Sequence, residues 1–125
     1  MDGKTILIVD DDLHVKKILG LSIGRAGYVV QTAANGMDAL TMIREQPPDV
    51  LITDIEMPKM SGKELCLTIE RDMPDRKFLI IVMTSISERD ASSWIRDVTK
   101  AEYMEKPLSP KRVVARLGEY FQATP

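Results

Sequence analysis

Five polar residues that could do chemistry together lie at or just after the ends of short apolar runs. They are Asp10, Asp11, Asp54, Thr84 and Lys106. If the apolar runs are parallel strands, these residues lie at the carboxyl ends of the strands, where open parallel sheets bind their ligands. Their placement therefore predicts one acidic site that binds a metal ion and a phosphate group.

The acidic residues predict a site for a divalent cation. Asp10 and Asp11 end one predicted strand, and Asp54 ends another that neighbours the first in a flavodoxin-like strand order. Two carboxylates about 4 Å apart repel by on the order of 4 kcal/mol at an effective dielectric constant of about 20. Mg²⁺ or Mn²⁺ would offset this repulsion with oxygen ligands alone, and proton sharing is the metal-free alternative. His14 is the only histidine, so the sequence offers no zinc cluster.

Thr84 and Lys106 add two groups that a bare metal site lacks, a hydroxyl and a mobile ammonium, and both could meet phosphoryl oxygens. A carboxylate that attacks phosphorus forms an acyl phosphate, which is a known form of covalent catalysis. Phosphoryl transfer mainly requires alignment and neutralisation of the phosphoryl oxygens. The combination predicts phosphoryl transfer to a carboxylate.

The apolar runs predict strands because they are short and rich in β-branched residues. Between them, apolar residues recur at helical spacing. Strict alternation of strand and helix predicts an α/β fold with one parallel sheet, helices on both faces and right-handed crossovers. The predicted strands are residues 5–9, 28–33, 50–53, 78–83 and 103–104.

Boundary signals place the five helices. Gly27 is expected to cap the end of the first helix, and Asn35 to cap the start of the second. The third follows Ser61, and Ser109 begins the fifth with a proline in the next position. The apolar stripes are Val15, Ile18 and Leu19; Ala39, Leu40 and Ile43; Leu65, Cys66 and Ile69; Ala91, Trp94, Ile95 and Val98; and Val113, Val114, Leu117 and Phe121.

Composition limits the setting. The chain has 125 residues and a formal net charge of −2, which argues against a protein built mainly to bind nucleic acid. No membrane span or signal peptide is visible, and the single cysteine, Cys66, lies on an apolar helix stripe. We expect a cytoplasmic protein with one domain over residues 1–125.

Several short motifs, in order along the chain, resemble two-component response-regulator receiver domains of the CheY-like superfamily. They are Ile-Val-Asp-Asp at 8–11, Asp-Ile-Glu-Met-Pro at 54–58, Gly62, Thr84-Ser85 and Tyr-Met-Glu-Lys-Pro at 103–107. The resemblance covers nearly the whole chain. It implies a flavodoxin-like (βα)5 three-layer sandwich with strand order 2-1-3-4-5.

The resemblance also implies roles for the site residues. Asp54 would accept a phosphoryl group from a histidine on a kinase or a phosphotransfer protein. Asp11 and Asp54 would bind Mg²⁺ directly, Asp10 would bind it through water, and the backbone carbonyl of Glu56 would complete the set, with Mn²⁺ as a possible substitute. The phosphoryl-contacting residues would be Thr84 and Lys106.

Further implied features concern structure and output. Met57, Pro58 and Gly62 would form the turn from the phosphorylated strand into the third helix, and Pro107 would follow a cis peptide bond. Phosphorylation would move Thr84 and turn Tyr103 inward. The signal would pass through the fourth helix, fifth strand and fifth helix to a partner protein, a fused effector domain or a second copy, without direct contact to nucleic acid or membrane.

Some positions depart from the family pattern or stay open. Thr99-Lys100 stands where the family often has Gly-Ala, so the start of the fifth strand could differ. Glu56 and Ile86 are hypothesised to tune the lifetime of the phosphoryl group. Trp94 could anchor a partner, although its place on an apolar stripe favours burial. Two other functions stay open: a binding scaffold that needs no phosphorylation, and a Mg²⁺-dependent aspartyl phosphohydrolase.

Overall fold

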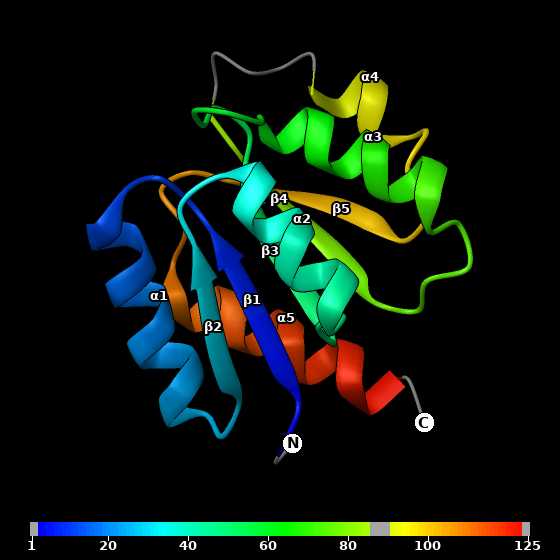
Figure 1. Ribbon diagram of the computed structural model, residues 1–125. Helices are drawn as coiled ribbons and strands as arrows, with labels where there is room; N and C mark the ends of the chain where they lie inside the picture. The colour runs from blue at the N-terminus through cyan, green and yellow to red at the C-terminus, as the bar shows by residue number, and fades with distance from the viewer. Residues whose placement is uncertain (1–2, 86–90, 124–125) are drawn as a thin grey trace.

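The computed structural model describes residues 3–85 and 91–123, in which five strands and five helices alternate along the chain (Figure 1). The strands form one parallel sheet in the order β2-β1-β3-β4-β5. This confirms the predicted fold class and strand order. The strands are β1 (Thr5–Val9), β2 (Val29–Ala33), β3 (Val50–Asp54), β4 (Leu79–Thr84) and β5 (Ala101–Glu105). The helices are α1 (Leu13–Arg25), α2 (Gly36–Glu45), α3 (Gly62–Asp72), α4 (Ala91–Ile95) and α5 (Pro110–Ala123).

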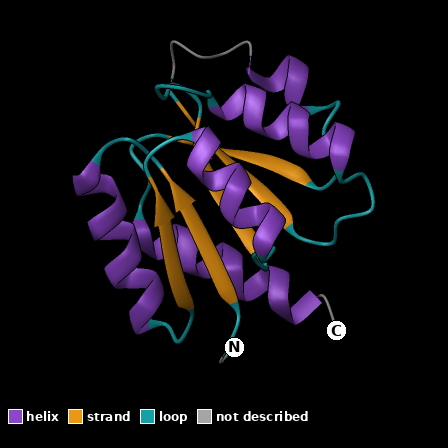
Figure 2. Ribbon diagram, viewed as in Figure 1, coloured by secondary structure: helices purple, strands orange, loops and turns teal. Residues whose placement is uncertain are grey.

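Helices cover both faces of the sheet, so the molecule has three layers (Figure 2). One apolar cluster packs the sheet against α2, α3 and the end of α4, and the other packs it against α1 and α5. Every residue of β3 and β4 is buried. Strands covered on both faces are expected to be apolar throughout, which explains why their runs were easy to recognise.

Side chains at the helix ends fix where several helices begin. Asp12 caps α1 by accepting hydrogen bonds from the amides of His14 and Val15, at 2.8 and 3.4 Å. Asn35 caps α2 through the amide of Asp38, at 2.8 Å. Ser61 and Glu64 form a reciprocal capping box at the start of α3. Because Asp12 and Asn35 follow closely on the ends of β1 and β2, their caps also fix the loops there.

The C-terminal end of α1 differs by one residue from the prediction. The C-cap is Ala26, and Gly27 follows it with a φ of 103°. The amide of Gly27 donates to Gly24 O and that of Tyr28 donates to Ile23 O. This is a Schellman motif, in which glycine occupies the position just past the cap.

The fourth helix and the fifth strand differ in length from the predictions. α4 ends at Ile95, and a turn follows in which the Val98 amide donates a hydrogen bond of 3.0 Å to Ile95 O, with the Val98 side chain buried in the core. Trp94 is partly buried against the core, as its apolar stripe favours. β5 runs over Ala101–Glu105, longer than expected, because an edge strand can carry polar residues on its exposed side.

Thr99 is attached to α3 at the start of β5. Its amide and hydroxyl both donate to Glu70, each at 2.9 Å, and its carbonyl accepts from Arg76. The buried Arg76 guanidinium also pairs with Glu70 at 3.0 Å and lies over the ring of Phe78. Lys100 follows with a φ of 51°. The chain therefore enters β5 through a contact network of its own where the family often has Gly-Ala.

Candidate functional site

Sheet register brings the ends of four strands to one edge. Val9 lies beside Thr53, Asp54 beside Met83, and Thr84 beside Glu105. The residues that follow β1 and β5, Asp10 and Lys106, therefore lie at the same edge as Asp54 and Thr84. All five chemistry-bearing residues predicted from the sequence lie at this edge.

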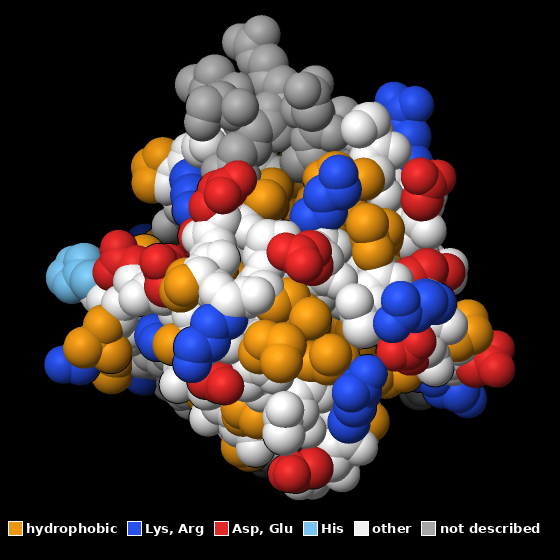
Figure 3. All heavy atoms as spheres, turned by 45° about the horizontal axis from the view of Figure 1, so that its top comes forward, with side chains coloured by type: hydrophobic (Ala, Val, Ile, Leu, Met, Phe, Trp, Pro, Cys, Tyr) orange, Lys and Arg blue, Asp and Glu red, His pale blue; other side chains and the backbone are white. Residues whose placement is uncertain are grey.

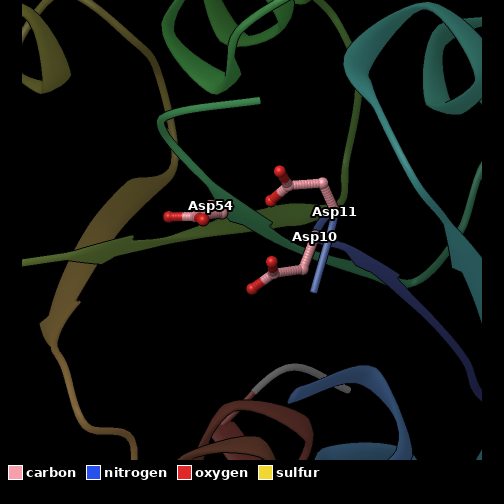
Figure 4. A group of neighbouring side chains, drawn as sticks. All are labelled: Asp10, Asp11 and Asp54. Carbon is pink, nitrogen blue, oxygen red and sulfur yellow. The ribbon is translucent and has the colours of Figure 1, made fainter. Parts of the chain in front are cut away.

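Three carboxylates gather there (Figure 4). One oxygen from each of Asp10, Asp11 and Asp54 lies within 4.8 Å of the others. Asp10 and Asp54 are buried, whereas Asp11 is exposed. Figure 4 shows the Asp10 and Asp11 side chains leaving the end of one strand on different sides, with Asp54 opposite them on its neighbour.

Asp10 is held by the backbone that follows it. Its Oδ1 accepts a hydrogen bond of 2.8 Å from the Asp12 amide, while its buried Oδ2 has no hydrogen-bond partner within the described part of the chain. Burial raises the pKa of the Asp10 carboxyl from 3.8 to about 6, and the negative charges of Asp54 and Asp11 add to the increase. The site therefore contains one buried carboxylate oxygen, Asp10 Oδ2, that receives no hydrogen bond from the described residues.

These features fit a hard divalent cation. The candidate ligands are carboxylate oxygens from two adjacent strands, and the buried Asp10 Oδ2 has no hydrogen-bond donor among the described residues. Mg²⁺ and Mn²⁺ bind through such oxygen ligands. Glu56 lies two residues past Asp54, in the loop that joins β3 to α3, and its side chain is exposed. The donor set thus agrees with the cation predicted from the sequence.

Lys106 supplies the positive charge at the site. Its Nζ lies 2.7 Å from Asp54 Oδ1, which also accepts the amide of Ile55 at 2.8 Å. The Lys106 amide donates to Thr84 O at 2.6 Å, so the backbone joins Lys106 to the end of β4. Thr84 is buried, and the peptide bond between Lys106 and Pro107 is cis, as the resemblance implies.

The turn after Asp54 depends on a glycine. The amide of Gly62 donates to Ile55 O at 2.7 Å, so α3 begins against the backbone that follows the phosphoacceptor candidate. A Cβ atom at Gly62 would overlap Asp54 O and lie 3.0 Å from Ile55 Cα. Met57 packs partly against the core, and Pro58 is exposed. Only glycine allows this close approach.

An apolar wall lies next to the acidic residues. A cleft of about 560 Å³ runs from the carboxylates and Lys106 to side chains of α1, Met83 and the chain after Lys106. Exposed Leu13 and Ile18 lie on α1, and Figure 3 shows the histidine beside acidic side chains on this side of the molecule. Ile18 falls on a helical stripe, so the sequence pattern indicated core. The apolar lining residues are Val15, Ile18, Leu19, Met83, Pro107 and Leu108.

Tyr103 is expected to take part in the conformational switch, and Ile86 to influence the lifetime of the phosphoryl group. Tyr103 lies on β5 with 51% of its surface exposed, so it does not fill the core in this structure. Ile86 lies outside the described residues.

No described helix is both long enough and apolar enough to cross a membrane.

Comparisons with known proteins agree with the geometry. The response regulator receiver domain family matches residues 6–118. The phosphate regulon transcriptional regulatory protein PhoB of Pseudomonas aeruginosa is 35% identical over 124 residues, which cover 99% of this chain and 54% of PhoB. The response regulator MprA of Mycobacterium ulcerans is 34% identical over 120 residues, covering 95% and 51% of the two chains.

A solved structure gives the same result for the fold. The chemotaxis response regulator CheY4 of Vibrio cholerae superposes with a TM-score of 0.83 at 26% identity, covering 93% of this chain and 97% of that chain. The chain spans about half the length of the curated relatives it matches. Since the family match covers most of the sequence and the fold and strand-end residues agree with it, the chain belongs to the response regulator receiver domain family.

Proposed function

We propose that this chain is a phosphoacceptor switch in which Asp54 receives a phosphoryl group from a histidine of a kinase or a phosphotransfer protein. The observation that carries the proposal is the 2.7 Å contact between Lys106 Nζ and Asp54 Oδ1 beside two further carboxylates. An ammonium group already on the acceptor carboxylate needs to move only slightly to meet an oxygen of the incoming phosphoryl group.

Each residue has a defined part in the transfer. An oxygen of Asp54 attacks phosphorus, the phosphorus–nitrogen bond of the phosphohistidine breaks, and the imidazole leaves with the bonding electron pair and takes up a proton. Lys106 and Thr84 stabilise the charge on the phosphoryl oxygens. Asp10, Asp11, Asp54 and the Glu56 carbonyl would hold Mg²⁺, or Mn²⁺ in its place. The bound cation would neutralise the carboxylates and the phosphoryl oxygens.

The output follows from added charge. Phosphorylation would replace the single negative charge of the Asp54 carboxylate with a phosphoryl group that carries about −1.5 to −2 charges, which would attract the Thr84 hydroxyl and leave space for Tyr103 to turn inward. β5 and α5 form one surface because Glu102 binds Arg116 through two contacts of 2.7 Å. This surface, with α4, would signal to a partner, a fused effector domain or a second copy.

The setting is part of the same proposal. Residues 1–125 would form a single receiver domain that works in the cytoplasm and acts as a phosphoacceptor rather than as an enzyme on external substrates. The domain itself would bind neither nucleic acid nor membrane. Glu56 beside the acceptor would influence how long the phosphoryl group survives.

Intact mass measurement tests the proposal. The protein is incubated with Mg²⁺ and acetyl phosphate or phosphoramidate, and one added phosphoryl group is expected. Asp54→Asn should abolish the adduct, whereas Asp75→Asn, at an exposed acid away from the site, should retain it. EDTA should prevent the reaction.

Two results would contradict the proposal. A wild-type protein that forms no adduct with any donor would favour a scaffold that works without phosphorylation. Repeated turnover of p-nitrophenyl phosphate that requires Asp54 would favour a phosphohydrolase.

A further inference from the structure

The loop over residues 55–61 joins the phosphoacceptor strand to α3 and carries Glu56. Its start is held by the Gly62 amide, which donates to Ile55 O at 2.7 Å. Its end is held by the Ser61 cap, whose hydroxyl accepts the Glu64 amide at 3.1 Å. Within the loop the Met60 amide donates to Pro58 O at 2.7 Å, and the Met60 carbonyl, next to Ser61, makes a contact with another element.

α2 supplies that contact. The amide of Gly36 donates to Met60 O at 3.0 Å, although α2 and the loop are separated in sequence by β3. Gly36 is the first residue of α2, so its amide has no acceptor within the helix. The neighbouring cap residue Asn35 is buried and engages Asp38 through two hydrogen bonds, of 2.8 and 3.1 Å. This pair fixes the direction in which the Gly36 amide points.

The contact requires glycine for reasons of space. A Cβ atom at Gly36 would lie 2.6 Å from Met60 O, 2.8 Å from Met60 Cγ and 2.9 Å from Met60 Cβ. The Met60 side chain could turn away, but the carbonyl oxygen can move only with the loop backbone. The three atoms nearest to an added methyl group all belong to Met60, so the substitution would displace the loop at that residue rather than contact an acidic side chain.

We propose that Gly36 is a positioning residue for cation binding, because its amide and its missing side chain hold the 55–61 loop, and with it the Glu56 carbonyl, beside the acidic cluster. The inference rests on the proposed function, which assigns that carbonyl to the Mg²⁺ site. Outer contacts that orient metal ligands commonly change metal affinity by about 10- to 100-fold. Gly36→Ala should therefore raise the dissociation constant for Mg²⁺ by about tenfold.

The first test compares two glycine replacements. Mg²⁺ binding is measured by calorimetry, and Mn²⁺ binding by the electron paramagnetic resonance signal of the free ion, for wild type, Gly36→Ala and Gly118→Ala. A Cβ at Gly118 on α5 would meet no atom within 4 Å, so this matched control should bind both ions as wild type does. Urea unfolding in EDTA accompanies each titration. A purely packing role would lower the unfolding free energy of metal-free Gly36→Ala and leave the dissociation constant of its folded form unchanged.

The second test needs no variant. Coupling between two binding events is reciprocal, so a contact that favours Mg²⁺ binding must itself be favoured by Mg²⁺ to the same extent. Saturating Mg²⁺ should slow hydrogen exchange at the Gly36 amide by about tenfold. The Gln46 amide, which donates to Met42 O at the other end of α2, should exchange at an unchanged rate.

The outcomes separate this inference from the proposed function. Two results together support the inference: Gly36→Ala binds the cations more weakly than wild type, and Mg²⁺ slows hydrogen exchange at the Gly36 amide of the wild-type protein. Equal Mg²⁺ affinity of the two glycine variants, or a Gly36 amide that does not respond to Mg²⁺, overturns it while the proposed function stands. A wild-type protein that binds neither cation overturns both. If Gly36→Ala does not fold, hydrogen exchange in wild type decides.

Discussion

Replacing Asp10 with asparagine removes a buried negative charge and leaves the size of the side chain almost unchanged. Burial raises the pKa of the Asp10 carboxyl from 3.8 to about 6 in the folded protein. The folded state therefore binds this proton more tightly than the unfolded chain, and stability falls as the pH rises through this window. Above pH 6 the charged carboxylate costs about 3 kcal/mol of unfolding free energy.

Asp10→Asn should recover much of this cost in metal-free protein. The amide oxygen can still accept the Asp12 amide, and the new NH2 group replaces Oδ2, which has no donor within the described residues and lies among the other carboxylates. We expect the variant to gain up to about 3 kcal/mol over wild type at pH 7.5, of which about 1.4 kcal/mol should develop between pH 5 and pH 7.5.

Urea unfolding in EDTA at several pH values measures this difference. With a slope of about 2 kcal/mol per molar urea, the full effect would move the midpoint by about 1.5 M. Asp12→Asn is the matched control, because asparagine also caps helices well, and its effect should stay within about 0.5 kcal/mol. A stability gap between Asp10→Asn and wild type that is the same at pH 5 and pH 7.5 would refute the assignment of the cost to this carboxyl.

Two further predictions concern the backbone contact at Gly62 and the side-chain network around Arg76. Gly62→Ala should lower the unfolding free energy by about 3 kcal/mol because its Cβ would overlap Asp54 O, whereas Gly118→Ala should be neutral or stabilising; urea unfolding compares them. Arg76→Met should cost about 2 kcal/mol and speed hydrogen exchange at the Thr99 amide, since the buried guanidinium holds both Glu70 and Thr99 O. Arg71→Met, at an exposed pair with Asp72, should change neither quantity, and equal effects of the two arginine variants would contradict the network.

Much of the fold could be predicted because its signals are local. The fully buried β3 and β4 gave unbroken apolar runs, and the caps at Asn35 and Ser61 used residue types with a strong positional preference. The order of the strands came from the family resemblance, because strand pairing joins residues far apart in the sequence. The length of β5 was missed because Ala101 and Glu105 carry no apolar pattern at an edge.

The candidate site was predictable to the extent that strand ends share one edge of the sheet. The gathering of Asp10, Asp11 and Asp54 follows from that rule together with the strand order that the family resemblance implied. The contact between Gly36 and Met60 O could not be predicted, because a glycine at a helix start has many possible causes. The Arg76 network was missed for a similar reason, since its partners, Glu70 and Thr99, come from two separate segments.

The hydrogen bond from the Lys106 amide to Thr84 O connects the backbone at the end of β4 to the backbone just after β5. A shift of the backbone at Thr84 would therefore also move the backbone at Lys106, so lengthening either strand would displace both residues. Building this site into another parallel sheet would require both strand ends, with the register between them unchanged. Insertions would be tolerated only after the residues that form this hydrogen bond.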